Sequence, residues 1–121
     1  FLHIASGWDF RAMLDHRDRM AADYGLELIV HHNEEAAAAG VNPFDTPTPT
    51  YTRLMLTEAL RAALDAGGYD AIFGGGRRDE EKARAKERIA SFRNAQHRWD
   101  PKAQRPELWN LLNLRVNRGE S

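Results

Sequence analysis

Three short apolar runs alternate with longer helical segments, and this alternation constrains the fold more than any other feature of the sequence. The runs are residues 1–5, 26–31 and 69–73, and each has a glycine close beside it. Short apolar runs bounded by turn residues predict buried strands. Strands joined by helices predict crossover connections and a parallel sheet. We therefore predict an α/β fold with a mainly parallel sheet.

Apolar residues recur at helical spacing between and after these runs. The pattern predicts one helix between Asp9, its expected N-cap, and Gly25. It predicts further helices at residues 34–39, 52–66 and 79–90, and a short one that begins at Pro106. Residues 42–50 contain three prolines, which should exclude a helix and disfavour a central strand. That loop is either a functional segment or a surface excursion.

Composition removes several classes of function. The chain has 121 residues and a formal net charge of −1, so no global charge attracts nucleic acid or an anionic membrane. There is no cysteine, which excludes disulfides, thiolate metal sites and cysteine nucleophiles within these residues and suits a reducing, cytoplasmic setting. No apolar run approaches the ~18 residues of a membrane span. We expect no nucleic-acid partner and no membrane contact.

A glycine and arginine block follows the third run directly, as Phe73, then Gly74, Gly75 and Gly76, then Arg77 and Arg78. Glycines let the backbone approach a ligand closely, and a following helix start favours anions. Paired guanidinium groups bind oxyanions in a bidentate manner. Ligands of parallel sheets bind at the carboxyl ends of the strands, where residues 6–8 also lie. The block therefore predicts an anion site.

The block is locally basic, because residues 77–98 contain eight Lys or Arg and four acids. The alternative interpretation is a solvated helix with pairs such as Glu80 and Arg84 at i,i+4 spacing. No Lys-Ser or Lys-Thr follows the glycines, so the segment is not a P-loop, and it is not a dinucleotide fingerprint.

Residues 73–88 resemble the small, nucleotide-binding subunits of heteromeric bacterial sulfate adenylyltransferases, a family related to phosphoadenosine-phosphosulfate reductases. The chain differs from that family's pattern in this block only at Gly76 and Ala83. Further matches are residues 7–8, 42–44, 91–93, 97–102 and 104–109. The resemblance covers nearly all of the chain.

The resemblance implies a doubly wound, adenine-nucleotide α-hydrolase-like α/β fold. It also implies an enzyme that joins ATP and sulfate into adenosine 5′-phosphosulfate and pyrophosphate, with Mg²⁺. It also implies a GTPase large subunit as partner. Two alternatives stay open. One is a reductase-like enzyme that uses a phosphosulfate donor, and the other is a non-catalytic module that binds anions or nucleotides.

The resemblance also implies roles for individual residues. Arg77 and Arg78 would be catalytic and hold polyphosphate or sulfate oxygens. Lys82, Arg84 and Arg88 would extend the positive surface that these two arginines form. Residues at the end of the first predicted strand would line the adenine or ribose side of the nucleotide. The full ligand-binding set is Ser6, Gly7, Trp8, Gly74, Gly75, Gly76, Lys82, Arg84 and Arg88. No metal ligand is predicted.

Four departures from the family pattern concern charge. The chain has Ala5 where the family has Asp, Asp9 where it has Lys, and Leu56 where it has Lys. Residues 46–52 replace a lysine-bearing loop. In the family a pyrophosphate-binding loop precedes the first matched strand. We therefore expect residues 1–121 to be one fragment of a catalytic domain, truncated at both ends, that does not catalyse adenylylation alone.

Other polar and aromatic residues favour ordinary roles. His31 and His32 are adjacent in a predicted strand and point to opposite faces, which argues against a shared metal. His97 and Asp100 favour a polar loop contact over an acid–base pair. Trp99 and Trp109 favour packing over stacking on a base or partner.

Overall fold

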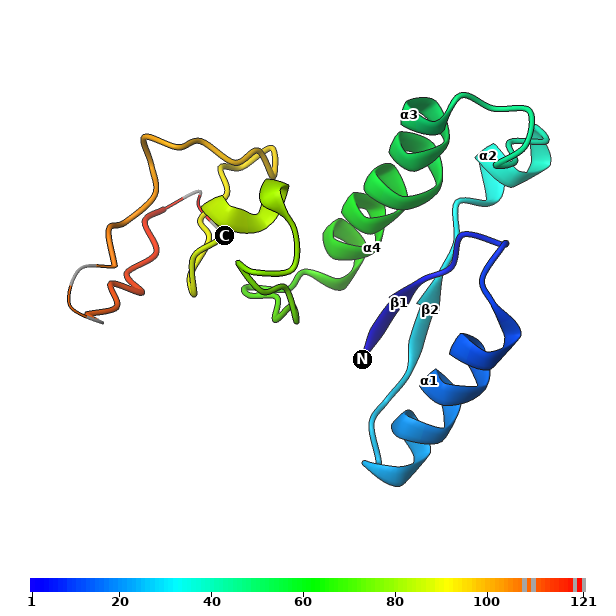
Figure 1. Cartoon of the computed structure of the whole chain (residues 1–121), viewed down its shortest axis with the longest axis horizontal. Coiled ribbons are helices and arrows are strands. Elements are labelled where there is room, and N and C mark those ends of the chain that lie inside the picture. Colours follow the sequence, from blue (N-terminus) through cyan, green and yellow to red (C-terminus); the bar gives the residue numbers. More distant parts are fainter. Residues whose placement is uncertain (108, 110, 119, 121) are drawn as a thin grey trace. The chain divides into compact units, whose positions relative to one another are not determined.

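The computed structural model describes residues 1–107, 109, 111–118 and 120. It contains two compact units, Phe1–Gly68 and Tyr69–Ser121, which are described separately below. The first unit holds both strands and nearly all of the helical structure (Figure 1).

Two parallel strands lie side by side in the first unit (Figure 1). They are β1 (Leu2–Ile4) and β2 (Ile29–His31), paired with Leu2 opposite Ile29. Helix α1 (Arg11–Asp23) connects them. This crossover unit confirms the predicted parallel pairing, although both strands are shorter than the apolar runs that predicted them. The doubly wound arrangement of a larger sheet stays a prediction.

The start of α1 differs from the prediction. Its N-cap is Phe10, which has no capping side chain, so the expected cap at Asp9 is wrong. The Asp9 carboxylate accepts instead from the backbone N–H and hydroxyl of Ser6, three residues earlier. The helix ends as predicted next to Gly25, which has a φ of +61°.

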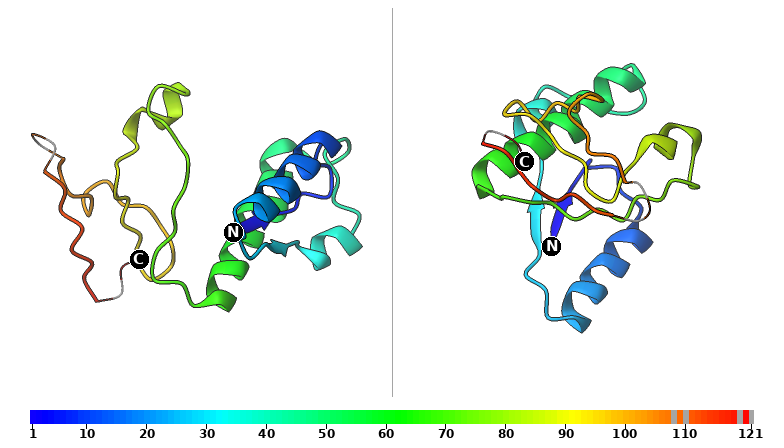
Figure 2. Two further views of the ribbon diagram at one scale, coloured as in Figure 1. Left: turned by 90° about the horizontal axis from the view of Figure 1, so that it is seen from below. Right: turned by 90° about the vertical axis from the view of Figure 1, so that its left-hand side faces the viewer.

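One unbroken helical segment follows the 42–47 loop (Figures 1 and 2). It consists of α3 (Thr48–Tyr51), the π-helical η1 (Thr52–Glu58) and α4 (Ala59–Gly67). The prediction that prolines exclude a helix before residue 51 is wrong. Pro49 lies in the first turn, where a backbone N–H has no intrahelical partner to lose.

Asn33 ties this segment to the short helix α2 (Glu34–Ala38). Its Oδ1 accepts from the backbone N–H of Ala36 at 3.0 Å and so caps α2. Its Nδ2 donates to the carbonyl of Leu54 in η1 at 2.9 Å. The next residue, Met55, is the most completely buried large side chain described. A widened turn is common where a helix meets a functional site.

Small side chains form most of the core of the first unit. Helix α4 contacts β2, and η1 contacts α2. The strands themselves are only partly covered, because Val30 stays half exposed. The buried residues of this unit are Ala21, Ala36, Met55, Ala59, Ala63 and Leu64.

We expect Asn33→Ala to lower the free energy of unfolding by about 1–2 kcal/mol, because it removes the cap of α2 together with the bond to η1. Asn33→Asp keeps the capping oxygen but cannot donate to Leu54, so its loss should be smaller. Urea unfolding of the full chain measures both. Equal stability of Asn33→Ala and the wild type would contradict the assigned role.

The second unit has little regular structure. Residues 69–73 are not a strand, because they pair with no neighbouring strand among the described residues and Phe73 is 98% exposed. The predicted helix at 79–90 is also wrong. Only the 3-10 helix η2 (Lys82–Lys86) forms there. This charged segment offers almost no apolar face, and packing of such a face is what stabilises most helices in proteins.

The helix predicted from Pro106 falls partly on residues 108 and 110, which lie outside the described residues. Leu111 and Leu112, its predicted apolar side, belong to no helix. Isolated antiparallel bridges join Arg93 to Trp99 and Asn94 to Glu120. Only the second of these bridges joins residues that are distant in the sequence.

Candidate functional site

An open pocket of about 530 Å³ lies in the first unit, where β1 and β2 end. This is the carboxyl edge of the parallel strands, the usual ligand side of such sheets. The pocket also takes residues from α2, from the loop after it and from η1. Its lining consists of Ser6, Gly7, Trp8, His32, Ala37, Gly40, Val41, Asn42, Phe44, Asp45 and Met55.

A tight turn after β1 forms one wall of the pocket. The hydroxyl of Ser6 accepts from the backbone N–H of Trp8 at 3.1 Å. Gly7 has a φ of +81°, a conformation that residues with a Cβ rarely adopt. A Cβ at this position would also lie 3.4 Å from Cε1 of His32. The turn therefore needs glycine for its backbone shape and leaves little free space behind it.

Two aromatic rings meet at the pocket. Trp8 and Phe44 pack edge to face, with centroids 5.1 Å apart and an interplanar angle of 87°. The two side chains are 53% and 78% exposed. Exposed rings beside a pocket provide flat surfaces on which a planar ligand can stack.

Polar groups of the pocket are held by local hydrogen bonds. Nδ1 of His32 lies 2.8 Å from the carbonyl oxygen of Ala5 and donates to it, which leaves Nε2 of a neutral ring as an acceptor. Oδ1 of Asn42 accepts from the backbone N–H groups of Phe44 and Asp45 at 2.9 and 3.0 Å. Its Nδ2 donates to the Asp45 carboxylate at 3.2 Å.

The lining carries one carboxylate, Asp45, and no Lys or Arg. A polyanion finds no positive partner among these side chains. An uncharged planar group finds two aromatic rings and several hydrogen-bonding atoms. The pocket therefore suits a base or nucleoside better than a phosphate or sulfate.

The structure brings Ser6, Gly7 and Trp8 together at this pocket, where the sequence predicted a ligand-binding turn. Sequence reasoning missed His32, Asn42, Phe44, Asp45 and Met55 as pocket residues. Two features of the sequence pointed to this loop: its prolines, and the match of residues 42–44 to the family pattern. Nothing in the local sequence indicates that Met55 faces a pocket.

The arginine block belongs to the second unit. Arg77 is 74% exposed on its side chain, and its Nε donates to Asp79 at 3.2 Å. Nε of Arg78 donates to the carbonyl of Glu87 at 2.7 Å, and its Nη2 forms an ion pair with Glu107. Arg77 is thus the more exposed of the two and has one acidic neighbour, whereas Arg78 is held by two internal partners.

Burial raises the pKa of the Glu107 carboxyl, but the opposing interactions prevail and hold it below its usual value. They are hydrogen bonds from the backbone N–H groups of Ile89 and Ala90 and from Arg78, together with the Arg78 charge. Glu107 thus joins residues 78 and 89, which lie far from it in the sequence.

Other basic residues of the block are arranged locally. Nε of Arg84 lies 3.5 Å from Glu80, so the predicted i,i+4 pair forms without the predicted helix. Nη1 of Arg88 donates to the carbonyls of Lys86 and Glu87. Lys82 is exposed. A Cβ on Gly76 would lie 2.8 Å from Nη1 of Arg84, so this glycine lets the guanidinium approach the backbone.

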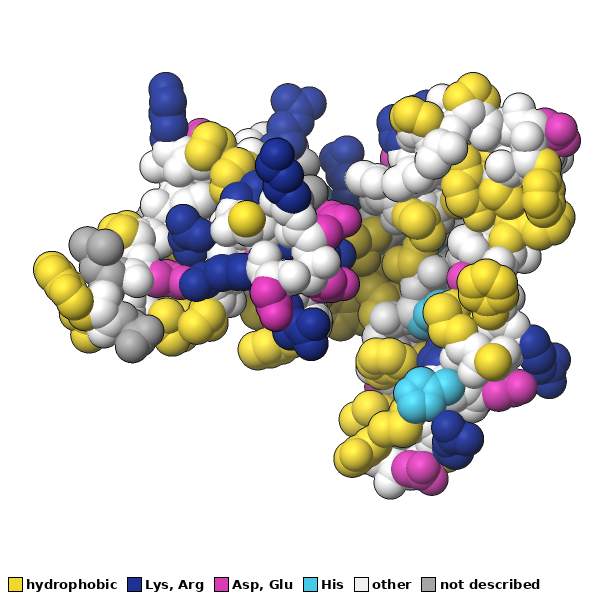
Figure 3. Space-filling view, in the orientation of Figure 1, with side chains coloured by type: hydrophobic (Ala, Val, Ile, Leu, Met, Phe, Trp, Pro, Cys, Tyr) yellow, Lys and Arg dark blue, Asp and Glu magenta, His cyan; other side chains and the backbone are white. Residues whose placement is uncertain are grey.

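Figure 3 shows the Lys and Arg side chains of the second unit, in dark blue, over much of its visible face. Asp and Glu side chains, in magenta, lie among them. The local excess of positive charge predicted from the sequence is thus partly compensated by neighbouring acids.

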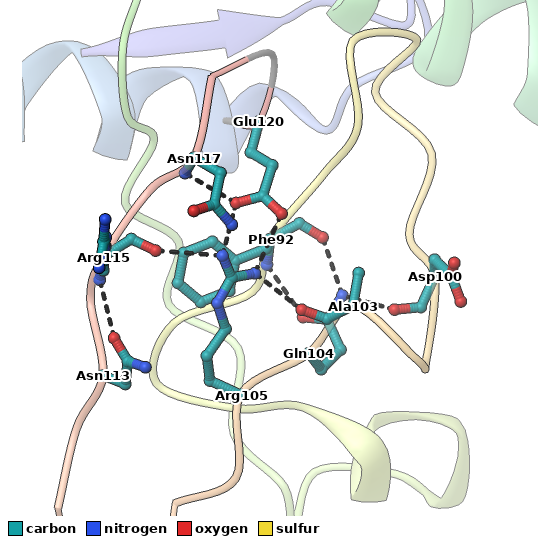
Figure 4. Close-up of polar contacts among 9 residues, drawn as sticks. All are labelled: Phe92, Asp100, Ala103, Gln104, Arg105, Asn113, Arg115, Asn117 and Glu120. Carbon is teal, nitrogen blue, oxygen red and sulfur yellow. Dashed lines mark hydrogen bonds and ion pairs between the residues drawn. The ribbon is translucent and has the colours of Figure 1, made fainter.

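Arg105 is the centre of a second polar cluster (Figure 4). Its guanidinium carbon lies 3.7 Å from the ring centroid of Phe92, which is buried. Nη2 forms an ion pair with Glu120 at 2.5 Å and donates to the carbonyl of Arg115 at 3.1 Å. Nη1 donates to the carbonyl of Ala103 at 2.7 Å. These contacts make Arg105 a structural residue.

The Glu120 carboxyl shows the strength of this cluster. The side-chain hydrogen bond from Arg105, followed by the backbone N–H of Asn117, lowers the pKa of Glu120 to about 2. Burial acts in the opposite direction and is outweighed. The carboxylate therefore stays charged well below the pH at which an ordinary Glu titrates.

The remaining predicted candidates belong to the second unit. Nζ of Lys86 lies 5.0 Å above the ring of Trp99, which is a cation–π contact, and Trp109 is 86% exposed. His97 sits at a turn with a φ of +57°. Among the described residues, no group of three or more His, Asp or Glu side chains is placed to hold a metal ion. No helix in that same part of the chain is long and apolar enough to cross a membrane.

Comparisons with known proteins cover the whole length of the chain. The family model described as phosphoadenosine phosphosulfate reductase domain matches residues 1–117. Several curated proteins named sulfate adenylyltransferase subunit 2 are also similar. The protein of Geotalea daltonii is 61% identical over 120 residues, and that of Acinetobacter baumannii (strain AYE) is 59% identical over 120 residues. That of Chelativorans sp. is 59% identical over 121 residues.

These similarities cover 99–100% of this chain but 40% of each relative. The chain therefore spans less than half the length of the curated relatives that it matches.

Proposed function

Because the chain belongs to the phosphoadenosine phosphosulfate reductase domain family, we propose that it is the nucleotide-binding part of a sulfate adenylyltransferase subunit 2. Its substrates are ATP and sulfate, and its products are adenosine 5′-phosphosulfate and pyrophosphate. The names of relatives 59–61% identical to the chain favour this activity within the family.

The pocket at the ends of β1 and β2 is the observation that carries the proposal. Its aromatic rings and hydrogen-bonding groups, with no Lys or Arg among its lining residues, suit an adenine or ribose. Ser6, Gly7 and Trp8 line this nucleoside side.

The reaction requires charge neutralisation more than a side-chain nucleophile. A sulfate oxygen attacks the α-phosphorus of ATP, the bond from that phosphorus to the bridging oxygen breaks, and pyrophosphate leaves with the electron pair. Arg77 and Arg78 hold phosphate or sulfate oxygens, and Lys82, Arg84 and Arg88 extend the positive surface. Gly74, Gly75 and Gly76 allow close backbone approach.

Mg²⁺ fits only as an ion carried by the nucleotide. No group of three acidic or imidazole side chains is available for it among the described residues. Mg²⁺ keeps several waters and commonly binds substrate phosphates with one or two carboxylates.

The proposed partner is a GTPase large subunit, whose GTP hydrolysis drives the unfavourable adenylylation. The name "subunit 2" that these relatives carry supports an assembly of unlike subunits. A second candidate, reduction of a phosphosulfate donor, is favoured by the description of the family model alone.

Pyrophosphate release separates these candidates. The full-length protein with its large subunit, ATP, GTP and sulfate should release pyrophosphate in a sulfate-dependent manner. Sulfite formed from a phosphosulfate and a thiol reductant, without pyrophosphate release, would instead establish the reductase activity. Absence of both reactions despite nucleotide binding would favour a non-catalytic module.

Replacing Trp8 by Ala should weaken ATP binding about tenfold, because stacking on an aromatic ring contributes roughly 1–3 kcal/mol per base. Trp109→Ala is the matched control, since it removes an exposed Trp outside the pocket. Calorimetric titration of both variants with ATP measures the effect. An unchanged Kd for Trp8→Ala would remove Trp8 from the nucleoside site.

A further inference from the structure

Asp9 does not line the pocket, yet its carboxylate holds a residue that does. Oδ2 accepts from the backbone N–H of Ser6 at 3.1 Å, and Oδ1 accepts from the Ser6 hydroxyl at 3.0 Å. The Asp9 side chain is only 15% exposed, so water competes weakly for these bonds. One carboxylate thus fixes both the backbone and the side chain of Ser6.

Ser6 connects Asp9 to the rest of the turn through hydrogen bonds. Its hydroxyl donates to Asp9 and accepts from the backbone N–H of Trp8, so the two hydrogen bonds fix its orientation together. Its carbonyl accepts from the hydroxyl of Tyr51 at 3.4 Å, which connects the turn to α3.

His3 approaches the same carboxylate from the strand. Its Nε2 lies 3.8 Å from Oδ2 of Asp9 and has no hydrogen-bond partner among the described residues. The imidazole is 16% exposed. Asp9 therefore has polar neighbours both in β1 and in the turn that follows it.

We propose that Asp9 is the positioning residue of the pocket: it fixes the turn formed by Ser6, Gly7 and Trp8 and so presents the Trp8 ring to the nucleoside. The inference rests on the proposed function for the identity of the ligand, but not for the structure of the turn. In the family pattern that the sequence resembles, Lys occupies this position, and an ammonium group cannot accept from Ser6.

The experiment uses the full chain with Trp99→Phe and Trp109→Phe, which leaves Trp8 as the single tryptophan. Acrylamide quenching of Trp8 without ligand reports the order of the turn, and ATP titration reports binding. Asp9→Ala should increase quenching and weaken ATP binding about five- to tenfold, because the carboxylate acts on the ligand only indirectly, through the order of the turn. Asp9→Asn keeps one acceptor oxygen and should restore part of both effects.

Two further variants keep the test decisive. Asp15→Ala removes an exposed carboxylate of α1 that pairs with Arg11, and it should change neither readout. Ser6→Ala should weaken binding in the wild-type background and have little further effect beside Asp9→Ala, because both remove the same link. Ser6→Ala also tests the link if Asp9→Ala fails to fold.

The outcomes separate this inference from the proposed function. Unchanged quenching and unchanged ATP affinity in Asp9→Ala would overturn the positioning role. If the unmodified chain binds no ATP but Asp9→Ala still increases quenching, the turn assignment stands and the nucleotide assignment fails. Additive effects of Ser6→Ala and Asp9→Ala would also count against a shared link.

Discussion

Reversing the charge of Arg77 is expected to weaken ATP binding about a hundredfold while leaving the fold intact. The variant Arg77→Glu removes a charge-assisted hydrogen bond of about 1.5–3 kcal/mol and adds repulsion between its carboxylate and the phosphates. The fold should tolerate the change because the side chain is 74% exposed and its ion pair is with nearby Asp79. Calorimetric titration with ATP measures affinity, and thermal unfolding checks stability.

The control is Lys102→Glu, which makes the same change in net charge at an exposed site outside the arginine block. It should leave ATP affinity nearly unchanged. Arg78→Ala should differ from both, because it also leaves Glu107 without its ion pair and therefore lowers stability. If Arg77→Glu and Lys102→Glu weaken binding equally, the effect is one of global charge and Arg77 is no anion ligand.

The part of the fold that could be predicted from sequence is the part determined by local patterns. The apolar runs and the helix between them gave the pairing of β1 with β2, and glycine marked the end of α1 at Gly25. The predicted helix at 52–66 is present but begins earlier, at Thr48. Its π-helical turn accepts a hydrogen bond from Asn33, a residue far away in sequence, and had no local signal.

The predictions that failed depended on partners outside the segment. The run at 69–73 has strand composition, yet a strand forms only where another strand pairs with it. The charged segment after Arg78 has helical spacing of Glu80 and Arg84, and that pair forms, but no apolar face is packed to stabilise an α-helix. Local propensity was correct about the ion pair and wrong about the helix.

The candidate site also contains some residues that local sequence patterns predict and others that depend on distant parts of the chain. The turn of Ser6, Gly7 and Trp8 could be predicted because a small-residue turn at the end of a strand is a recurrent ligand position. Phe44 and Met55 could not be, because they reach the pocket only through the fold of the loop and of η1. The hydrogen bonds between Asp9 and Ser6 were not predicted, because an Asp that precedes a helix is ordinarily expected to cap it.

The second prediction with a large effect concerns stability. Arg105→Ala should lower the midpoint of thermal unfolding of the second unit by roughly 5–10 °C, because it removes an ion pair, two carbonyl contacts and the packing on Phe92 at once. Arg105→Lys keeps the charge but loses the planar fork, so it should recover only part of the loss. Trp99 fluorescence during heating follows this unit.

The same cluster should make stability depend on acid. A carboxyl whose pKa is lowered by folding stabilises the folded state above its unfolded pKa, and this contribution is lost as pH falls toward the folded pKa. For Glu120 the window runs from about 4.5 down to about 2, and the lowered pKa of Glu107 acts in the same direction. The unfolding midpoint of the second unit should therefore fall across this window. The Glu120→Gln variant should be less stable than the wild type at neutral pH, and its unfolding midpoint should fall less steeply across this pH window. An equally steep fall of the midpoint in that variant would show that other groups cause the acid dependence.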